Sequence, residues 1–234
     1  MKLLPRLMVI AAMAVQLYSC SVIEKSSMHG FESDYYTFSS SKEGVLEVYA
    51  DLTEDKIDVY KAPDKKLEDF IIRIPFSATD SLPDGSIKFS ERSLDIDITT
   101  ILFKYHPSVY NLPPQLTTDF NVALYAGWRH DDYHVKTRRD PLANYNNRIV
   151  NRAYDFGIFA GPGTTLVSPF TTRNAFSDEY NGFILQFGLA GFLESNVASF
   201  GIATGLDYLL SSDRKIWIYN NKPWVGFIIG IALN

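Results

Sequence analysis

The sequence has little cysteine and no long apolar run, and each shortage excludes a class of protein. Cys20 is the only cysteine among the 234 residues, so an exported chain can form neither an internal disulfide nor a thiolate metal site. Apart from a short run near the N-terminus, no segment approaches the about 20 apolar residues that a membrane helix needs, whereas a membrane β-strand needs only about 10. Acidic residues outnumber basic ones, 27 to 22, which argues against nucleic acid as a partner.

The N-terminal segment has the pattern of an export signal. Lys2 and Arg6 precede the apolar run 7–17, which is too short to span a bilayer, so residues 1–19 are predicted to be a signal peptide. The sequence Leu-Tyr-Ser-Cys, ending at Cys20, is similar to a bacterial lipoprotein cleavage box, in which the cysteine becomes the acylated first residue. We therefore predict lipidation at Cys20; a plain signal peptide that contains a cysteine is the alternative.

The first part of the mature chain has weaker signals. Residues 20–41 are predicted to be a lipid anchor and flexible tether, because they are rich in serine and show no sustained period. Val45–Tyr49 and Lys56–Tyr60 predict a hairpin, and Phe70–Phe76 predicts a further strand. Leu82–Gly85 is a turn signal. Two readings of residues 42–92 stay open: they complete a larger sheet with the rest of the chain, or they form a separate small β element.

The C-terminal segments alternate a bulky apolar residue with a small or polar one. Gly182–Leu193, Val197–Leu209 and Trp224–Leu233 show this pattern, and Leu116–His130 and Arg152–Gly163 repeat it. We predict an all-β fold, an antiparallel up-and-down β-barrel of about eight strands that faces lipid and occupies residues 42–234. Small residues on the second face predict a narrow lumen, not a wide pore. A soluble lipocalin-like fold is the alternative.

One strand changes phase, and the loops suggest an orientation. In Ser93–Tyr105 the alternation slips by one residue, which predicts a β-bulge near Thr99 and Thr100. Counting backwards from the C-terminus places the short connection Glu194–Asn196 on the inner side of the membrane, where barrel turns are short. Asp131–Val150 falls on that side too and is long, unless its flanking strands project and shorten the turn to Asp140–Asn146.

Few residues suggest chemistry. His130, Asp132 and His134 share one face of a continuing strand, so they could bind a divalent metal or act as a base and its orienting group. A solvated strand end is the simpler reading, and we expect neither a metal nor a cofactor. Aromatic residues of the last long loop, Trp217, Tyr219 and Trp224, are candidates for binding a partner or for a girdle at the membrane interface.

Several short motifs resemble a family of uncharacterised exported proteins of Gram-negative bacteria. The likeness covers roughly Leu94 to Asn234, and it is carried by these segments: Thr100–Pro107, Asp119–Asn121, Tyr125–Arg129, Trp217–Tyr219, Lys222–Trp224 and Gly230–Asn234. The resemblance implies an outer-membrane-type β-barrel and no particular activity.

The sequence as a whole therefore predicts a non-enzymatic outer-membrane protein with a structural or partner-binding role. Its expected partners are membrane lipid and, as an open possibility, another envelope protein. Two alternatives remain: a barrel-embedded lipid-modifying enzyme that uses His130 and His134, and a soluble lipoprotein that binds a small apolar ligand.

Overall fold

The computed structural model describes residues 30–78, 86–142, 144–194 and 199–232. The predicted signal peptide, the lipidation site Cys20 and the turn Leu82–Gly85 lie outside these residues. The described chain is all-β: its strands belong to one twelve-stranded antiparallel sheet, and its helical residues form two short 3-10 turns, η2 (Pro63–Lys65) and η3 (Ser212–Lys215). Within the described ranges no helix is long and apolar enough to cross a bilayer.

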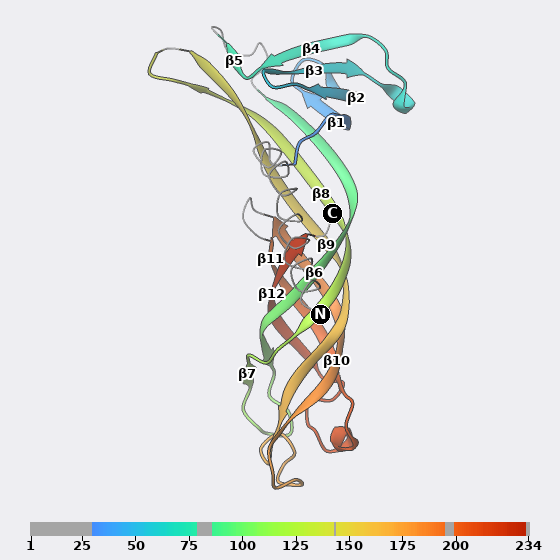
Figure 1. Cartoon of the computed structure of the whole chain (residues 1–234), viewed down its shortest axis with the longest axis vertical. Helices are drawn as coiled ribbons and strands as arrows, with labels where there is room; N and C mark the ends of the chain where they lie inside the picture. The colour runs from blue at the N-terminus through green and yellow to red at the C-terminus, as the bar shows by residue number, and fades with distance from the viewer. Residues whose placement is uncertain (1–29, 79–85, 143, 195–198, 233–234) are drawn as a thin grey trace, which may run out of the picture. The chain divides into compact units, whose positions relative to one another are not determined.

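The chain divides into two compact units (Figure 1). Unit 1 comprises Met1–Ser90 and Asp132–Asn151, and unit 2 comprises Glu91–Asp131 and Arg152–Asn234. Three long strands contribute residues to both units: β6 (Ile87–His106), β8 (Val122–Arg139) and β9 (Tyr145–Val167).

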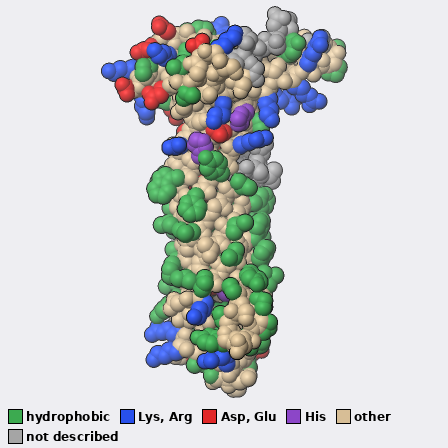
Figure 2. All heavy atoms as spheres, turned by 180° about the vertical axis from the view of Figure 1, so that it is seen from behind, with side chains coloured by type: hydrophobic (Ala, Val, Ile, Leu, Met, Phe, Trp, Pro, Cys, Tyr) green, Lys and Arg blue, Asp and Glu red, His purple; other side chains and the backbone are tan. Residues whose placement is uncertain are grey.

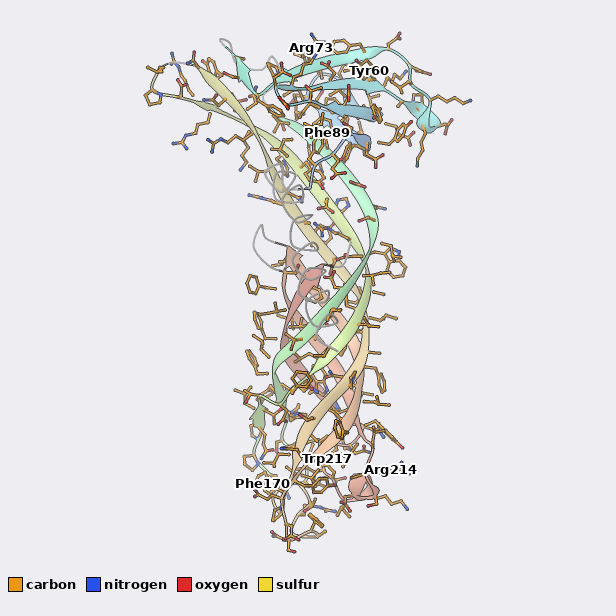
Figure 3. All side chains as sticks on the ribbon, viewed as in Figure 1. Tyr60, Arg73, Phe89, Phe170, Arg214 and Trp217 are labelled. Carbon is orange, nitrogen blue, oxygen red and sulfur yellow. The ribbon has the colours of Figure 1, made fainter. Side chains whose placement is uncertain are left out.

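Unit 1 is a sheet with an ordinary apolar core. Its other strands are β1 (Asp34–Ser40), β2 (Gly44–Leu52), β3 (Lys56–Lys61), β4 (Phe70–Pro75) and the short β5 (Ser77–Ala78). The pairing of Tyr49 with Tyr60 confirms the predicted hairpin, and β4 confirms the next predicted strand. Branched and aromatic side chains that alternate along β1 to β3 pack together with Phe89 (Figure 3).

One segment of unit 1 differs from the sequence prediction. Asp34–Ser40 was assigned to the tether, but it forms β1, which pairs with β2 on one side and with the start of β6 on the other. Tyr36 and Phe38 are buried from this strand, and their burial outweighs the serine-rich composition that suggested a tether. Gly44 begins β2 with φ of 74°, a conformation that a residue with a side chain rarely adopts.

The strands of unit 2 are bonded in a ring. Its remaining strands are β10 (Tyr180–Glu194), β11 (Ser199–Leu209) and β12 (Pro223–Ala232), with the short β7 (Gln115–Thr117) paired to β6. The hydrogen-bonded order is β12, β11, β10, β9, β8, β6, and β12 also pairs with β6. This path passes through fewer strands than the about eight expected for a barrel, because β1 to β4 continue the sheet within unit 1 instead of entering the ring.

The predicted bulge in β6 exists, but it lies further along the strand. Alternation of buried and exposed residues continues through Ile101 and then slips at Leu102 and Phe103, both of which are exposed. The register with β12 shifts at the same place, because Phe227 pairs with Phe103 and Ile228 pairs with Ile101. The bulge follows Ile101 and brings Lys104 and His106 to the buried face that Ile101 already occupies, whereas a slip near Thr99 and Thr100 would have turned Ile101 to the other face.

The connection between β8 and β9 is short. The backbone N–H of Asp140 donates to the carbonyl of Asn144 at 2.8 Å, so the turn falls within the predicted Asp140–Asn146 and the two strands extend up to it. This result removes the one long connection that did not fit the predicted alternation of short turns and long loops.

Candidate functional site

The buried face of unit 2 holds an ionic cluster that joins three strands. Nζ of Lys104 on β6 lies 2.8 Å and 2.9 Å from the two carboxylate oxygens of Asp207 on β11. The indole N–H of Trp224 on β12 donates to the same carboxylate at 2.9 Å, and its ring centroid lies 4.6 Å from Nζ. Since Lys104, Asp207 and Trp224 are all at most 2% exposed, each charge is compensated within the ring.

Further polar groups on this face form hydrogen bonds to neighbouring strands. The hydroxyl of Tyr125 donates to Asp155 at 2.7 Å, and the side-chain amide of Gln186 donates to the carbonyls of Val122 and Pro162, each at 3.2 Å. Phe159, Phe192 and Ile228 pack between these groups. The interior of the ring is therefore filled by side chains, as the small residues on this face led us to expect.

Large residues fit because the facing positions are small. A Cβ added to Gly205 would lie 2.8 Å from the ring of Trp224 and 2.7 Å from the carbonyl oxygen of Phe187. Ala190, Ala203 and Gly201 are likewise buried. Glycine and alanine thus provide the space that the indole ring occupies.

Loops close the end of the ring at which β6, β9 and β11 finish. Trp217, Ile218 and Tyr219 of the last loop pack on Val167, Ile184 and Leu209 at the strand ends. The backbone N–H of Ile218 donates to the carbonyl of Thr171 in the preceding loop at 2.9 Å. The ring of His106 lies 4.3 Å from that of Tyr219, centroid to centroid. The loops therefore cap this end (Figure 3, Trp217 and Phe170).

This finding corrects the interpretation of the last-loop aromatics. Trp217, Tyr219 and Trp224 were candidates for a partner-binding surface or a girdle, but they are 3%, 2% and 0% exposed. Trp217 and Tyr219 pack inside because the loop folds back across the strand ends, and Trp224 is buried because it faces the ring interior from β12. In this conformation none of the three rings presents a surface to a partner or to a membrane.

A shallow pocket of about 340 Å³ lies beside the cap. Its lining carries no charged side chain and combines hydroxyl, amide and apolar groups. The lining residues are Gln115, Leu116, Thr117, Thr165, Leu166, Ser168, Phe170, Thr171 and Tyr219.

The predicted histidine motif is placed on β8, but its members have other partners. His130, Asp132 and His134 alternate with the buried Asp131 and Tyr133, so they share one face of the strand as expected. In unit 2 the ring of His130 lies 5.2 Å from that of Tyr154. In unit 1 Asp132 accepts from the hydroxyl of Ser90 at 2.7 Å and pairs with Lys88 at 3.3 Å.

Among the side chains that the structure describes, no group of three or more His, Cys, Asp or Glu could hold a metal ion. Oδ1 of Asp132 is the atom that contacts both Ser90 and Lys88. Sequence reasoning singled out this motif and missed the Lys104 and Asp207 pair. A lysine that follows the apolar residues Ile101, Leu102 and Phe103 is the signal that could have revealed that pair.

No protein-family model, curated protein or solved structure matches this chain. The resemblance to exported barrel proteins stays a prediction, and the functional argument rests on the residues of the chain itself.

Proposed function

We propose that unit 2 spans a membrane as a closed, lipid-facing, up-and-down β-barrel and serves as a non-enzymatic anchor for unit 1. The observation that carries this proposal is the polarity of its two faces. Large apolar side chains are exposed along the outer face of every strand of the ring, while charged and polar side chains are buried within it. On the face drawn in Figure 2, hydrophobic side chains gather over the strands of unit 2. The exposed set is Leu94, Ile96, Ile98, Leu102, Phe103, Tyr105, Leu124, Trp128, Tyr154, Phe156, Ile158, Leu166, Phe183, Leu185, Phe187, Leu189, Leu193, Phe200, Ile202 and Val225.

Unit 1 has the opposite arrangement and serves as an internal comparison. Its large apolar residues lie in the core, and few are exposed: Val45, Leu67, Phe70 and Leu142. A water-soluble surface rarely exposes contiguous apolar patches larger than a few hundred square ångströms. The surface of unit 1 therefore suits contact with water, and we propose that the surface of unit 2 suits contact with lipid.

Strand length supports this proposal. β11 has 11 residues and β12 has 10 residues, which matches the about 9 to 11 residues that a tilted membrane strand needs. Trp128 is 76% exposed and Tyr154 is also exposed, as expected for aromatic residues at a membrane interface.

The filled interior favours an anchor over a channel or a carrier. Trp224, Phe159, Phe192 and the Lys104 and Asp207 pair occupy the space that a pore or an apolar ligand would need. A soluble lipocalin-like fold would place its apolar side chains inside, contrary to this pattern. A lipid-modifying enzyme that uses His130 would need an orienting partner, and Asp132 is engaged elsewhere.

The proposed location is the outer membrane of a Gram-negative bacterium. It rests on the signal peptide over residues 1–19 and on the orientation that short turns and long loops suggest. Acylation of Cys20 would add a second attachment to the membrane, and another envelope protein is the proposed partner of unit 1.

Carbonate extraction tests the anchor. We expect the full chain and its Cys20→Ala variant to remain equally in the membrane pellet, because the barrel alone would hold them there. Release of the variant into the carbonate supernatant, with retention of the acylated chain, would show a lipid-tethered soluble protein instead. A planar bilayer recording should give no unit conductance from the purified chain, and steady channel openings would refute a closed interior.

A further inference from the structure

The hairpin formed by the far ends of β8 and β9 in unit 1 is rich in arginine. The two strands run side by side to their turn (Figure 1), and Asp140 and Asn144 close that turn. The backbone N–H of Asn144 donates to Oδ1 of Asp140 at 2.8 Å, and its side-chain amide donates to Oδ2 at 3.2 Å. Both carboxylate oxygens of Asp140 are therefore committed to the turn itself.

Three arginine residues line one pocket beside this turn. The pocket has a volume of about 440 Å³ and is lined by Arg138, Arg139 and Arg148 together with Asp140, Pro141 and Asn146. Within the part of the chain that the structure describes, none of the three guanidinium groups forms an ion pair. Arg139 alone has an aromatic contact, 5.8 Å from the ring centroid of Tyr145.

Such a concentration of positive charge is unusual for this chain. The whole protein has a formal charge of −5, yet this pocket carries three arginines against one aspartate. Like charges in close proximity repel each other, and among the described residues Asp140 is the one anion that lines the pocket with them.

We propose that this pocket binds the phosphate group of an anionic ligand. A guanidinium group is planar and offers parallel N–H donors that match two phosphate oxygens, so arginines are well suited to phosphate recognition. Pro141 supplies an apolar wall, and Asn146 completes the lining. The formal charges of three arginines and one aspartate sum to about +2, which inorganic phosphate with two negative charges balances fully and a phosphodiester with one negative charge balances in part.

The proposal does not depend on whether unit 2 spans a membrane. The phosphate could belong to a small soluble molecule or to a lipid headgroup, because both present the same oxygens. The experiment therefore compares two soluble probes: inorganic phosphate, and glycerophosphoglycerol, which is the headgroup of phosphatidylglycerol. Acetate is the control for a carboxylate.

Isothermal titration of the full chain in an uncharged detergent measures binding of each probe. We expect inorganic phosphate, glycerophosphoglycerol or both to bind more tightly than acetate, and the probe that binds identifies the source. Replacing Arg138, Arg139 and Arg148 together by glutamine should weaken that binding at least tenfold, since each arginine contributes charged hydrogen bonds. Arg148→Gln alone should have a smaller effect in the same direction.

The matched control removes the same charge elsewhere. Arg92, Arg173 and Arg214 are exposed arginines outside the pocket, and their combined replacement by glutamine should leave the affinity within twofold. Equal losses in the two triple variants would reduce the effect to general electrostatic attraction and overturn the site. Absence of phosphate binding by the wild-type chain, or equal affinity for acetate, would also overturn it.

Discussion

A charged residue on the outer face of the ring separates a membrane protein from a soluble one. Ile202 on β11 is the most direct position, because it is 68% exposed and pairs with Gly191 of β10 and Phe227 of β12. Ile202→Arg removes an apolar side chain from the surface and adds a charge there. In water this change relieves exposure of an apolar group, whereas in lipid it places a charge within the hydrocarbon.

The size of the expected loss in the free energy of unfolding depends on how deep the substituted residue lies in the bilayer. An arginine on the lipid face of a barrel destabilises it by about 2 to 4 kcal/mol at the bilayer midplane and by about 0 to 1 kcal/mol near the interfaces. A surface substitution in a soluble protein usually changes stability by less than about 0.5 kcal/mol. We therefore expect Ile202→Arg to lower the free energy of unfolding by about 2 kcal/mol or more. Leu193→Arg, one residue from the end of β10, should lower it by less than about 1 kcal/mol.

Guanidinium unfolding in phosphatidylcholine vesicles, followed by tryptophan fluorescence, measures these changes. Trp128, Trp217 and Trp224 all belong to unit 2, so the signal reports on the ring alone. Val45→Arg is the control, followed by hydrogen exchange of β2 amides under the same conditions, because Val45 is 71% exposed but lies on β2 of unit 1, where the substitution should be nearly neutral.

The result that would refute the proposal is a lack of contrast. If Ile202→Arg changes the free energy of unfolding no more than Val45→Arg does, the outer face of the ring does not lie in lipid. A loss at Leu193 equal to that at Ile202 would likewise contradict a bilayer centred on the strands.

Two further predictions concern buried charges. Lys104→Met leaves Asp207 buried without its cation, so the free energy of unfolding should fall by about 3 to 5 kcal/mol in the same assay, whereas the double variant with Asp207→Leu should recover most of the loss. No recovery in the double variant would mean that packing, not charge compensation, sets the effect. In unit 1, a hydrogen bond from Arg73, 2.6 Å from Nε to Oδ1, holds the pKa of Asp58 below its usual range despite burial. The lowered pKa means that the stabilisation is present above pH about 4 and is lost as the pH falls through the folded-state pKa. Hydrogen exchange of β3 amides should therefore show Asp58→Asn less stable by about 1 kcal/mol at pH 7, a value kept small because the arginine is half exposed, with the difference shrinking below pH 4. Glu54→Gln, at an exposed turn, should show no such dependence, and a constant difference for Asp58→Asn at all pH values would contradict the assignment.

The sequence pattern was sufficient for most strands of unit 2 because their two faces differ so strongly. Alternation of bulky apolar residues with small ones in β10, β11 and β12 reflects one exposed face and one crowded face. The small residues Ala203 and Gly205 were correctly placed inside. Period-two alternation is a local property, so it is visible without knowing the partner strand.

The position of the bulge could not be predicted from the sequence of β6 alone. A slip at Thr99 or at Leu102 produces nearly the same pattern of apolar residues, and only the register with β12 distinguishes the two. The misplaced slip put Ile101 on the wrong face, and the partner of Lys104, Asp207, lies 103 residues away in the sequence. Pairings across such distances in sequence are not encoded in either strand alone.

The number of strands in the ring was also beyond sequence reasoning. The strands β1 to β4 have the composition of any half-buried sheet. Their sequences do not indicate that β1 pairs with β6 instead of closing a larger ring. The prediction for the aromatic residues of the last loop was wrong for a related reason. Trp217 and Tyr219 follow a strand end, which is typical of an interface girdle, but the fold of the loop across the ring decides whether they face outward.

A small ring with apolar surroundings restricts where any chemistry can occur. Six strands enclose a space that side chains fill, so its polar groups have little water to pair with and must find partners across the interior. Lys104 with Asp207, and Tyr125 with Asp155, satisfy this requirement, and such pairs are needed to keep the strands together. Groups committed in this way are not free to bind a ligand. Recognition should therefore occur outside the ring interior, and the arginine pocket of the β8 and β9 hairpin has what the interior lacks: charges that no described residue of the chain neutralises.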